Sequence, residues 1–358
     1  MAQRSSLISR TISTLIILIL ILTAIAVLTP LMGSRVFERT VIEMFLRVML
    51  VAGLYIFVGN SGVISFGHIG FMCLGAYAAA WFTIPPAMKG VSLPGLPSFL
   101  AQAQLHFLLS AALAGVFAAV FALIVGRIMM RLSGIAASIA TFAMLAVINT
   151  VYSNWDSVTG GTGSIVGIPF KTGLWTALGG AIFVVIIAYL YQISRSGLAL
   201  RAGRDEATAA AASGIDIVRE RLIAFVISAF TIGVAGALYA HFLGVVTPDA
   251  FYLSLTFVTL SMLVVGGMNS LSGAVIGVIV ISSIIQLLRS LEKGIDLGGT
   301  TLSIPNGLQE ISIGLVMIVI LMFRPAGLTR GREIVWNIWS SAGKAATSGE
   351  VAVSKNGA

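Results

Sequence analysis

Long apolar segments alternate with short polar connections along almost the whole chain. A helix needs roughly 20 apolar residues to cross a hydrocarbon core about 30 Å thick, and ten segments approach that length. They lie at 11–32, 41–59, 62–83, 104–126, 134–152, 174–192, 221–243, 251–267, 270–289 and 307–323. No connection between them is long enough to build a separate soluble core. The pattern predicts an all-α, polytopic transmembrane helical bundle of about ten spans.

Three of these segments leave open whether they cross the bilayer fully. Glycines interrupt the segment at 62–83, and the segments at 251–267 and 307–323 are short. The first segment raises another question, because Arg4 and Arg10 precede it as in a secretory signal. Its apolar run is longer than the core of about 7–15 residues that a signal has. We therefore expect a retained first span.

The basic residues indicate an orientation, because loops that face the cytoplasm carry excess Lys and Arg. With a cytoplasmic amino terminus and ten spans, fourteen of the 21 basic residues face the cytoplasm and six face outward, while Arg47 lies within the second span. One span fewer would place the basic carboxyl-terminal segment outside. We expect both termini to be cytoplasmic.

Composition excludes several classes of function. Charged residues make up only 9% of the chain, whereas soluble domains carry roughly 25%. The net charge of +8 comes from residues that form no dense basic run, which argues against a nucleic-acid surface. A single cysteine, Cys73, can build neither a disulfide framework nor a Cys-based metal site. No convergent set of catalytic groups is evident, so we expect no enzyme activity, metal or cofactor.

The longest connection predicted on the cytoplasmic side runs from 194 to 221. Within it, an alanine-rich stretch at 206–212 begins with an acid and precedes Gly214. These are the start and stop signals of a short helix. A surface helix that exposes alanine rather than lysine is suited to contact with another protein. An ordinary connector is the alternative, although a connector needs only a few residues.

Glycines loosen the backbone between the second and third segments, with polar side chains beside them. These residues are Gly59, Ser61, Gly62, Ser65, Gly67, His68 and Gly70. Broken helices persist in a bilayer only where protein or a water-filled path satisfies the freed backbone. We expect this region to line or gate a translocation path, with tight packing through small residues as the alternative. His68 is either a hydrogen-bonded structural side chain or a contact to substrate or proton.

Three smaller patterns add further expectations. A turn in an outward loop lacks the lysine and the spacing of a nucleotide-binding loop, and we expect it to act as an outer gate or docking turn. Gly273 and Gly277 predict close helix packing. Glu43 and Arg47 stand four residues apart and predict an ion pair on one helix face. The residues of the outward turn are Thr159, Gly160, Gly161 and Gly163.

Several short motifs, taken in order, resemble a known family. An Asp-Glu pair, an alanine-rich turn and a Gly-Ile eight residues after the Glu, followed by an apolar span, resemble the coupling loop of ATP-binding-cassette importer permeases. Further motifs are similar to the high-affinity branched-chain amino-acid permeases of the LivM type, over about residues 40–330. They lie at 59–62, 65–70, 75–77, 159–163, 167–169, 224–228, 235–239, 248–251, 266–267 and 323–328.

The resemblance implies partners and contact residues. In that family the short helix fits a groove on an ATPase subunit, and Thr208 stands where a second alanine is usual. The implied partners are two ATP-binding-cassette ATPase subunits, a homologous second permease subunit and a periplasmic substrate-binding protein, assembled in the bacterial inner membrane. The implied ATPase-coupling positions are Arg201, Arg204, Asp205, Glu206, Ala207, Ala210 and Gly214.

The expected function is a permease subunit that moves branched-chain or related amino acids by alternating access while its partners hydrolyse ATP. A permease for urea or short amides is one alternative. A secondary amino-acid carrier is another, although carriers ordinarily keep ionisable groups near the midplane. We divide the chain into a cytoplasmic segment with the first span (1–39), a permease transmembrane domain with its coupling loop (40–330), and a cytoplasmic tail expected to be disordered (331–358).

Overall fold

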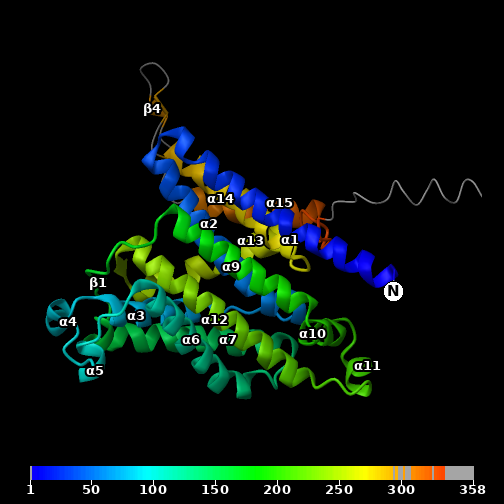
Figure 1. The fold of residues 1–358 in the computed structure, drawn as a ribbon, viewed down its shortest axis with the longest axis horizontal. Helices are drawn as coiled ribbons and strands as arrows, with labels where there is room; N and C mark the ends of the chain where they lie inside the picture. The colour runs from blue at the N-terminus through cyan, green and yellow to red at the C-terminus, as the bar shows by residue number, and fades with distance from the viewer. Residues whose placement is uncertain (1, 293–294, 297–300, 303–307, 325, 335–358) are drawn as a thin grey trace, which may run out of the picture.

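The protein is a bundle of long helices (Figure 1). The computed structural model describes residues 2–292, 295–296, 301–302, 308–324 and 326–334. Among these, eight helical segments are long and apolar enough to cross a membrane. They correspond to α1 (Ala2–Leu28), α2 (Arg35–Ser61), α6 (Phe107–Met129), α7 (Gly134–Asn154), α9 (Leu174–Ile193), α12 (Ile217–Leu243), α13 (Leu253–Gly266) and α14 (Leu271–Glu292).

Two further helices account for the remaining predicted segments. They are α3 (His68–Thr83) and α15 (Leu308–Phe323), each 16 residues long. The prediction of a helical membrane bundle is therefore confirmed, and the two short helices belong to segments whose full crossing the sequence left open. Most of the tail, residues 335–358, and the loop residue Lys293 lie outside the described residues.

Short elements connect the long helices. On one side of the bundle lie η1 (Pro30–Met32), α4 (Pro86–Ser92), α5 (Ser98–Ala101), α8 (Asp156–Thr159) and η2 (Pro248–Phe251), together with the antiparallel pair β1 (Ile165–Val166) and β2 (Val245–Val246). On the opposite side lie α10 (Arg195–Asp205) and α11 (Ala207–Ala212). A second antiparallel pair, β3 (Ile295–Asp296) and β4 (Thr301–Leu302), follows α14.

Connections that were expected on the same side of the membrane lie at the same end of the bundle. The amino-terminal end of α1 lies at the end that carries α10 and α11, opposite β1 and α4 (Figure 1). The Thr14 hydroxyl of α1 donates to the carbonyl of Ile334 at 2.9 Å, which places the described carboxyl-terminal segment there as well.

Helix boundaries differ from the hydropathy prediction where capping decides them. Helix α2 begins at Arg35 rather than at 41, because Ser34 accepts a hydrogen bond from the Phe37 amide and caps the helix. Helix α3 begins at His68 rather than at 62, because Gly62 takes a left-handed conformation with φ +71° and ends α2. Residues 62–67 are therefore not helical.

Helices α2 and α3 form the centre of the bundle. Every residue of α2 from 48 to 61 is buried, and so is every residue of α3 except Phe82. A helix that is apolar all round is buried on all sides, and in these two helices the sequence has that character. Helix α6, by contrast, exposes Val116, Val120 and Ile124 on one face, as expected of a helix at the lipid boundary.

Glycines allow the central helices to touch backbone to backbone. A Cβ built on Gly75 of α3 would lie 2.1 Å from the carbonyl oxygen of Gly233 in α12. A Cβ on Gly277 of α14 would lie 2.0 Å from the carbonyl oxygen of Met262 in α13. Such small residues are how helices approach closely without a water-driven hydrophobic effect. The close packing predicted for Gly273 and Gly277 is confirmed.

The α3–α12 contact gives a test of this packing. Gly75→Ala should lower the stability of the folded bundle by about 1–3 kcal/mol, because the added methyl group overlaps the backbone of α12. The matched control is Gly179→Ala in α9, where a Cβ meets nothing within 4 Å. Thermal unfolding of the detergent-purified protein measures both, and equal unfolding midpoints for the two variants would contradict the packing argument.

Candidate functional site: the coupling segment and two helix breaks

The connection between α9 and α12 folds into two short helices. Ser194 caps α10 by accepting a hydrogen bond from the Gly197 amide at 3.1 Å. Glu206 caps α11 by accepting hydrogen bonds from the amide and hydroxyl groups of Thr208. Gly214 follows α11 with φ +82°. The helix predicted over 206–212 is confirmed with Glu206 as its cap, whereas α10 had no counterpart in the sequence prediction.

Helix α11 presents alanine to solvent. Ala207, Ala209, Ala211 and Ala212 are exposed, and Ala210 alone is buried against the rest of the protein. Asp205 and Glu206, just before the helix, are exposed too, as is Gly214 after it. The segment therefore offers a surface of small side chains with two acids at its start.

Two arginines of α10 point toward the bundle. Arg201 donates to the carbonyl of Gln192 at the end of α9. Arg204 donates from Nη1 to the carbonyl of Gly59 at 2.7 Å and to Oδ1 of Asn269 at 3.2 Å. Of the sequence-predicted coupling residues, Asp205, Glu206, Ala207 and Gly214 thus face outward, while Arg201, Arg204 and Ala210 anchor the segment.

The first helix break, at residues 62–67, lies in contact with Arg204. Residues 62–67 leave α2 in a non-helical path, and side chains of α7 satisfy part of their backbone. The Ser138 hydroxyl donates to the carbonyl of Ile64 at 2.6 Å, and the Phe66 amide donates to the Thr141 hydroxyl at 3.2 Å. The sequence-predicted break is therefore present. The residues from Gly59 to His68 lie at the same end of the bundle as α10 and α11, which together are named the coupling segment.

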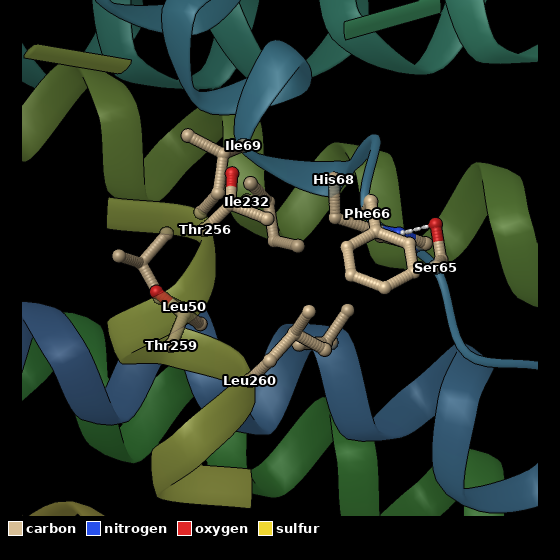
Figure 2. Close-up of a pocket in the computed structure, with 10 residues that line it drawn as sticks. Leu50, Ser65, Phe66, His68, Ile69, Ile232, Thr256, Thr259 and Leu260 are labelled. Atoms are coloured by element: carbon tan, nitrogen blue, oxygen red, sulfur yellow. Dashed lines mark hydrogen bonds between the residues drawn. The ribbon is translucent and has the colours of Figure 1, made fainter. Parts of the chain in front are cut away.

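His68 lies at the start of α3, inside the bundle (Figure 2). Its Nδ1 lies 2.6 Å from the Ser65 hydroxyl. The rings of Phe57, Phe71 and Phe225 surround the imidazole, with centroids 5.3, 5.7 and 5.3 Å from that of the His68 ring. His68 is 2% exposed. This environment fits the structural alternative of a hydrogen-bonded, buried histidine.

A small cavity adjoins this histidine. It has a volume of about 10 Å³, which is close to the space of one water molecule. Ser65, Phe66 and His68 line it from the first break, and Thr256 and Thr259 line it from α13 (Figure 2). The cavity therefore joins the break after α2 to a helix that is distant in the sequence.

A second helix break, at residues 267–270, separates α13 from α14. The carboxyl-terminal segment forms hydrogen bonds to the helix ends on both sides of it. The amides of Leu328 and Thr329 donate to the carbonyls of Val265 and Gly266 at 2.9 and 3.2 Å. The turn itself carries Asn269, the partner of Arg204.

Glu333 closes the same region. Its carboxylate accepts hydrogen bonds from the amides of Leu271 and Ser272 at 2.8 and 3.0 Å, at the start of α14. It also accepts one from Gln192 of α9 at 3.0 Å. A carboxylate at a helix amino terminus is favoured by the helix dipole. Nothing in the sequence prediction pointed to Asn269, Gln192 or Glu333. An acid among the basic residues after α15 is the one local signal that could have drawn attention to Glu333.

The outward turn at 159–163 lies at the other end of the bundle. The Thr159 hydroxyl donates to the carbonyl of Tyr152 at 2.6 Å, and the Gly163 amide donates to the carbonyl of Gly160 at 3.0 Å. Gly160 and Gly161 both have positive φ, at +74° and +58°. The predicted path residues therefore form two separate groups, one at each end, rather than one site.

Lys89 stabilises this end of the bundle. Its side chain is buried, and Nζ donates to the carbonyls of Leu100 at 2.9 Å and of Ala103, which ties α4 to the α5 turn. Burial lowers the pKa of Lys89 because it disfavours the charged form. From the sequence, Lys89 is one of the six basic residues expected to face outward.

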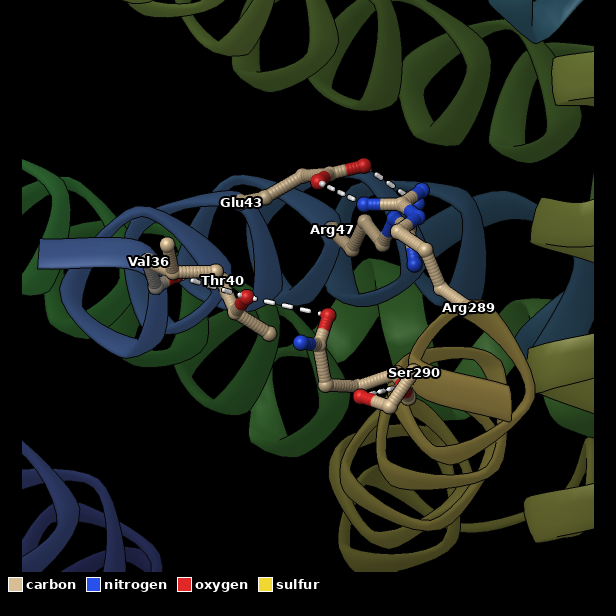
Figure 3. A network of polar contacts seen from close by, with 7 residues as sticks. Val36, Thr40, Glu43, Arg47, Arg289 and Ser290 are labelled. Atoms are coloured by element: carbon tan, nitrogen blue, oxygen red, sulfur yellow. Dashed lines mark hydrogen bonds and ion pairs between the residues drawn. The ribbon is translucent and has the colours of Figure 1, made fainter. Parts of the chain in front are cut away.

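The predicted ion pair of α2 is confirmed and has a third member. Arg47 donates to Glu43, and Nη1 of Arg289 from α14 lies 3.6 Å from the other carboxylate oxygen (Figure 3). Beside them the Thr40 hydroxyl donates to Oε1 of Gln286 at 3.0 Å. These contacts join α2 to α14 toward the end of the bundle opposite α10 and α11, and pairing reduces the cost of placing charges there.

Comparison with known proteins agrees with this architecture. The family model of the branched-chain amino acid transport system permease component matches residues 36–321. Two relatives are the high-affinity branched-chain amino acid transport system permease proteins LivM of Salmonella typhimurium and Escherichia coli. Each is 26% identical over 341 residues, which covers 86% of this chain and 73% of the relative. No solved structure matches the chain. The match over residues 36–321 shows that this multi-pass membrane protein belongs to the family of branched-chain amino acid transport system permease components.

Proposed function

We propose that this permease subunit carries branched-chain or related amino acids across the bacterial inner membrane by alternating access, driven by two separate ATP-binding-cassette ATPase subunits. The observation that supports this proposal most directly is the exposed alanine surface of α11, anchored by α10 next to a helix break. The chain has no phosphate-binding loop of the Walker type, so the proposal assigns ATP hydrolysis to the partners.

In this proposal the outward-facing residues of the coupling segment contact the ATPase. Asp205, Glu206, Ala207 and Gly214 supply the contact, and small side chains let a partner groove close on the helix backbone. Arg201, Arg204 and Ala210 hold the segment against the bundle. Closure of the ATPase pair on nucleotide would then move the segment and rock the helices, as in a rigid-body transition between two packed arrangements.

The first helix break supports the placement of the path. Ile64 is 38% exposed in this single chain, and Gly62 is exposed beside it. Non-helical backbone within a membrane must be covered by protein or line a water-filled cavity. A path between this subunit and a homologous second permease subunit satisfies that requirement. The residues from Gly59 to Gly70 then form the gate nearer the cytoplasm, and the turn at 159–163 forms the outer gate or a docking turn for a periplasmic binding protein.

Aromatic side chains around the break support an aliphatic substrate. The Phe66 ring lies 6.3 Å from that of Phe142 on α7 and 6.4 Å from that of Phe257 on α13. Phe142 and Phe257 are 40% and 55% exposed. Such a surface suits zwitterions with aliphatic side chains better than urea or short amides, which offer little apolar area to bury.

Orientation is tested by labelling single cysteines. The proposal has ten spans with both termini in the cytoplasm. In a background with Cys73→Ala, a membrane-impermeant maleimide should label Thr162→Cys in spheroplasts but should label Ser213→Cys only after the membrane is opened. Both positions are exposed, at opposite ends of the bundle. Labelling of Ser213→Cys in sealed spheroplasts would refute the cytoplasmic placement of the coupling segment.

The coupling role is tested by charge reversal at Glu206. Glu206→Lys should leave membrane insertion intact but reduce amino-acid uptake and ATPase co-purification on the order of tenfold or more, equivalent to about 1.4 kcal/mol or more of contact energy. Glu206→Asp, which keeps the charge and the capping carboxylate, should retain both activities.

Glu38→Lys serves as the matched control, because Glu38 is an exposed acid in the first turn of α2 at the other end of the bundle. Uptake that is unchanged in Glu206→Lys, and that proceeds without ATP in vesicles, would favour a secondary carrier over the proposed ATP-driven permease.

A further inference from the structure

We infer that Arg204 is a positioning residue that transmits movement of the coupling segment to both helix breaks at once. The inference rests on the proposed ATP-driven function. One side chain then links movement of the coupling segment by the ATPase to the gate formed by the residues from Gly59 to Gly70. The guanidinium of Arg204 joins α10 to the end of α2 and to the turn between α13 and α14.

The contact with the first break is both polar and steric. Gly59 lies in the last turn of α2, where carbonyl groups lack partners within the helix, and Arg204 donates to it from Nη1 at 2.7 Å. The aliphatic stem of Arg204 packs against Gly62, where a built Cβ would lie 2.6 Å from its Cγ. Gly62 also has φ +71°. Any displacement of Arg204 therefore acts on the residue at which α2 ends.

The contact with the second break runs through Asn269. The same Nη1 donates to Asn269 Oδ1 at 3.2 Å. Asn269 in turn packs on Gly331, where a built Cβ would lie 3.2 Å from the Cβ of Asn269. Gly331 belongs to the carboxyl-terminal segment that holds Gly266 and the start of α14. Arg204 thus reaches elements 145 and 65 residues away in the sequence.

The Arg204 guanidinium uses one edge, Nε and Nη2, to bind Asp205 and leaves Nη1 to bind the bundle. Oδ1 of Asp205 accepts from Nε and Nη2 of Arg204 at 3.2 and 3.1 Å, while Nη1 remains for the bundle. The Asp205 side chain is 71% exposed and that of Arg204 is 23% exposed. Asp205 precedes the cap of α11, so a partner that moves α11 also moves the group that orients Arg204. A lysine has a single ammonium group and cannot hold both edges in this way.

The first break and helix α13 meet at the small cavity near His68. Ser65 and His68 approach it from the first break, and Thr256 and Thr259 approach it from α13, the helix that ends at the second break. A side chain that shifts both breaks together changes the separation of these walls. Arg204 therefore sits where movement at the cytoplasmic surface becomes opening or closure within the bundle.

The test compares Arg204→Lys and Asn269→Ala with two matched arginine controls in the complete importer complex, reconstituted in vesicles. Arg204→Lys keeps the charge and most of the aliphatic stem against Gly62. It therefore removes the forked guanidinium but still fills the space beside Gly62. Arg195→Ala and Arg219→Ala remove exposed arginines from the same connection. The readout is the number of substrate molecules taken up per ATP hydrolysed, together with ATPase co-purification and the unfolding midpoint.

Arg204→Lys should retain ATPase association and hydrolysis but lower uptake per ATP on the order of tenfold, while both controls keep the wild-type ratio. Asn269→Ala should lower the ratio in the same direction, and the double variant should lose less than the product of the two single effects, because the residues act as one contact.

Two outcomes would overturn the inference. One is an unchanged uptake-to-ATP ratio in Arg204→Lys, and the other is loss of ATPase association in that variant, which would make Arg204 a docking residue. Uptake by the wild-type complex without ATP would instead overturn the proposed function. The same vesicles therefore separate the two failures.

Discussion

Every backbone amide and carbonyl inside a bilayer needs a hydrogen-bond partner, because hydrocarbon offers none. The long helices meet this requirement internally, and the two breaks do not. At the first break, Ser138 and Thr141 of α7 and Arg204 of α10 supply partners. At the second, the partners come from residues 328–333. Backbone and side-chain groups from distant segments therefore supply hydrogen-bond partners to both breaks.

This dependence connects the breaks to function. A helix in the middle of the bundle resists deformation, since its hydrogen bonds are internal and its contacts are packed. A break whose partners belong to other elements moves when those elements move. Arg204, which belongs to the segment that carries the exposed alanine surface, donates to the backbone of Gly59 beside the first break and to the side chain of Asn269 at the second. The two helix breaks and the exposed alanine surface of α11 are thus joined by one set of contacts through Arg204.

Charged side chains likewise lie where they have binding partners. Among the described residues, the Lys, Arg, Asp and Glu side chains that touch the long helices gather toward the helix ends. Glu43, Arg47 and Arg289 pair toward the end opposite α10 and α11, and Arg204 and Glu333 bind backbone groups at the end that carries those two helices. The centre is filled by apolar side chains and by glycines such as Gly75 that bring backbones together. A neutral interior suits a subunit that moves by shifting packed helices rather than by titrating buried groups.

The sequence by itself determined the long apolar helices, the glycine-rich break within 59–70, the alanine helix at 206–212 and the family resemblance, because hydropathy, glycine and capping residues are local signals. Only the tertiary structure decided that Arg204 points toward Gly59 and Asn269, that Glu333 caps α14, and that the turn at 159–163 lies apart from the break near His68. Residues 48–61 of α2 and the whole of α3 are almost entirely apolar, so their sequence marks no face for a particular neighbour. Contacts across 62 to 145 residues arise from packing alone, and no periodicity within one segment records them.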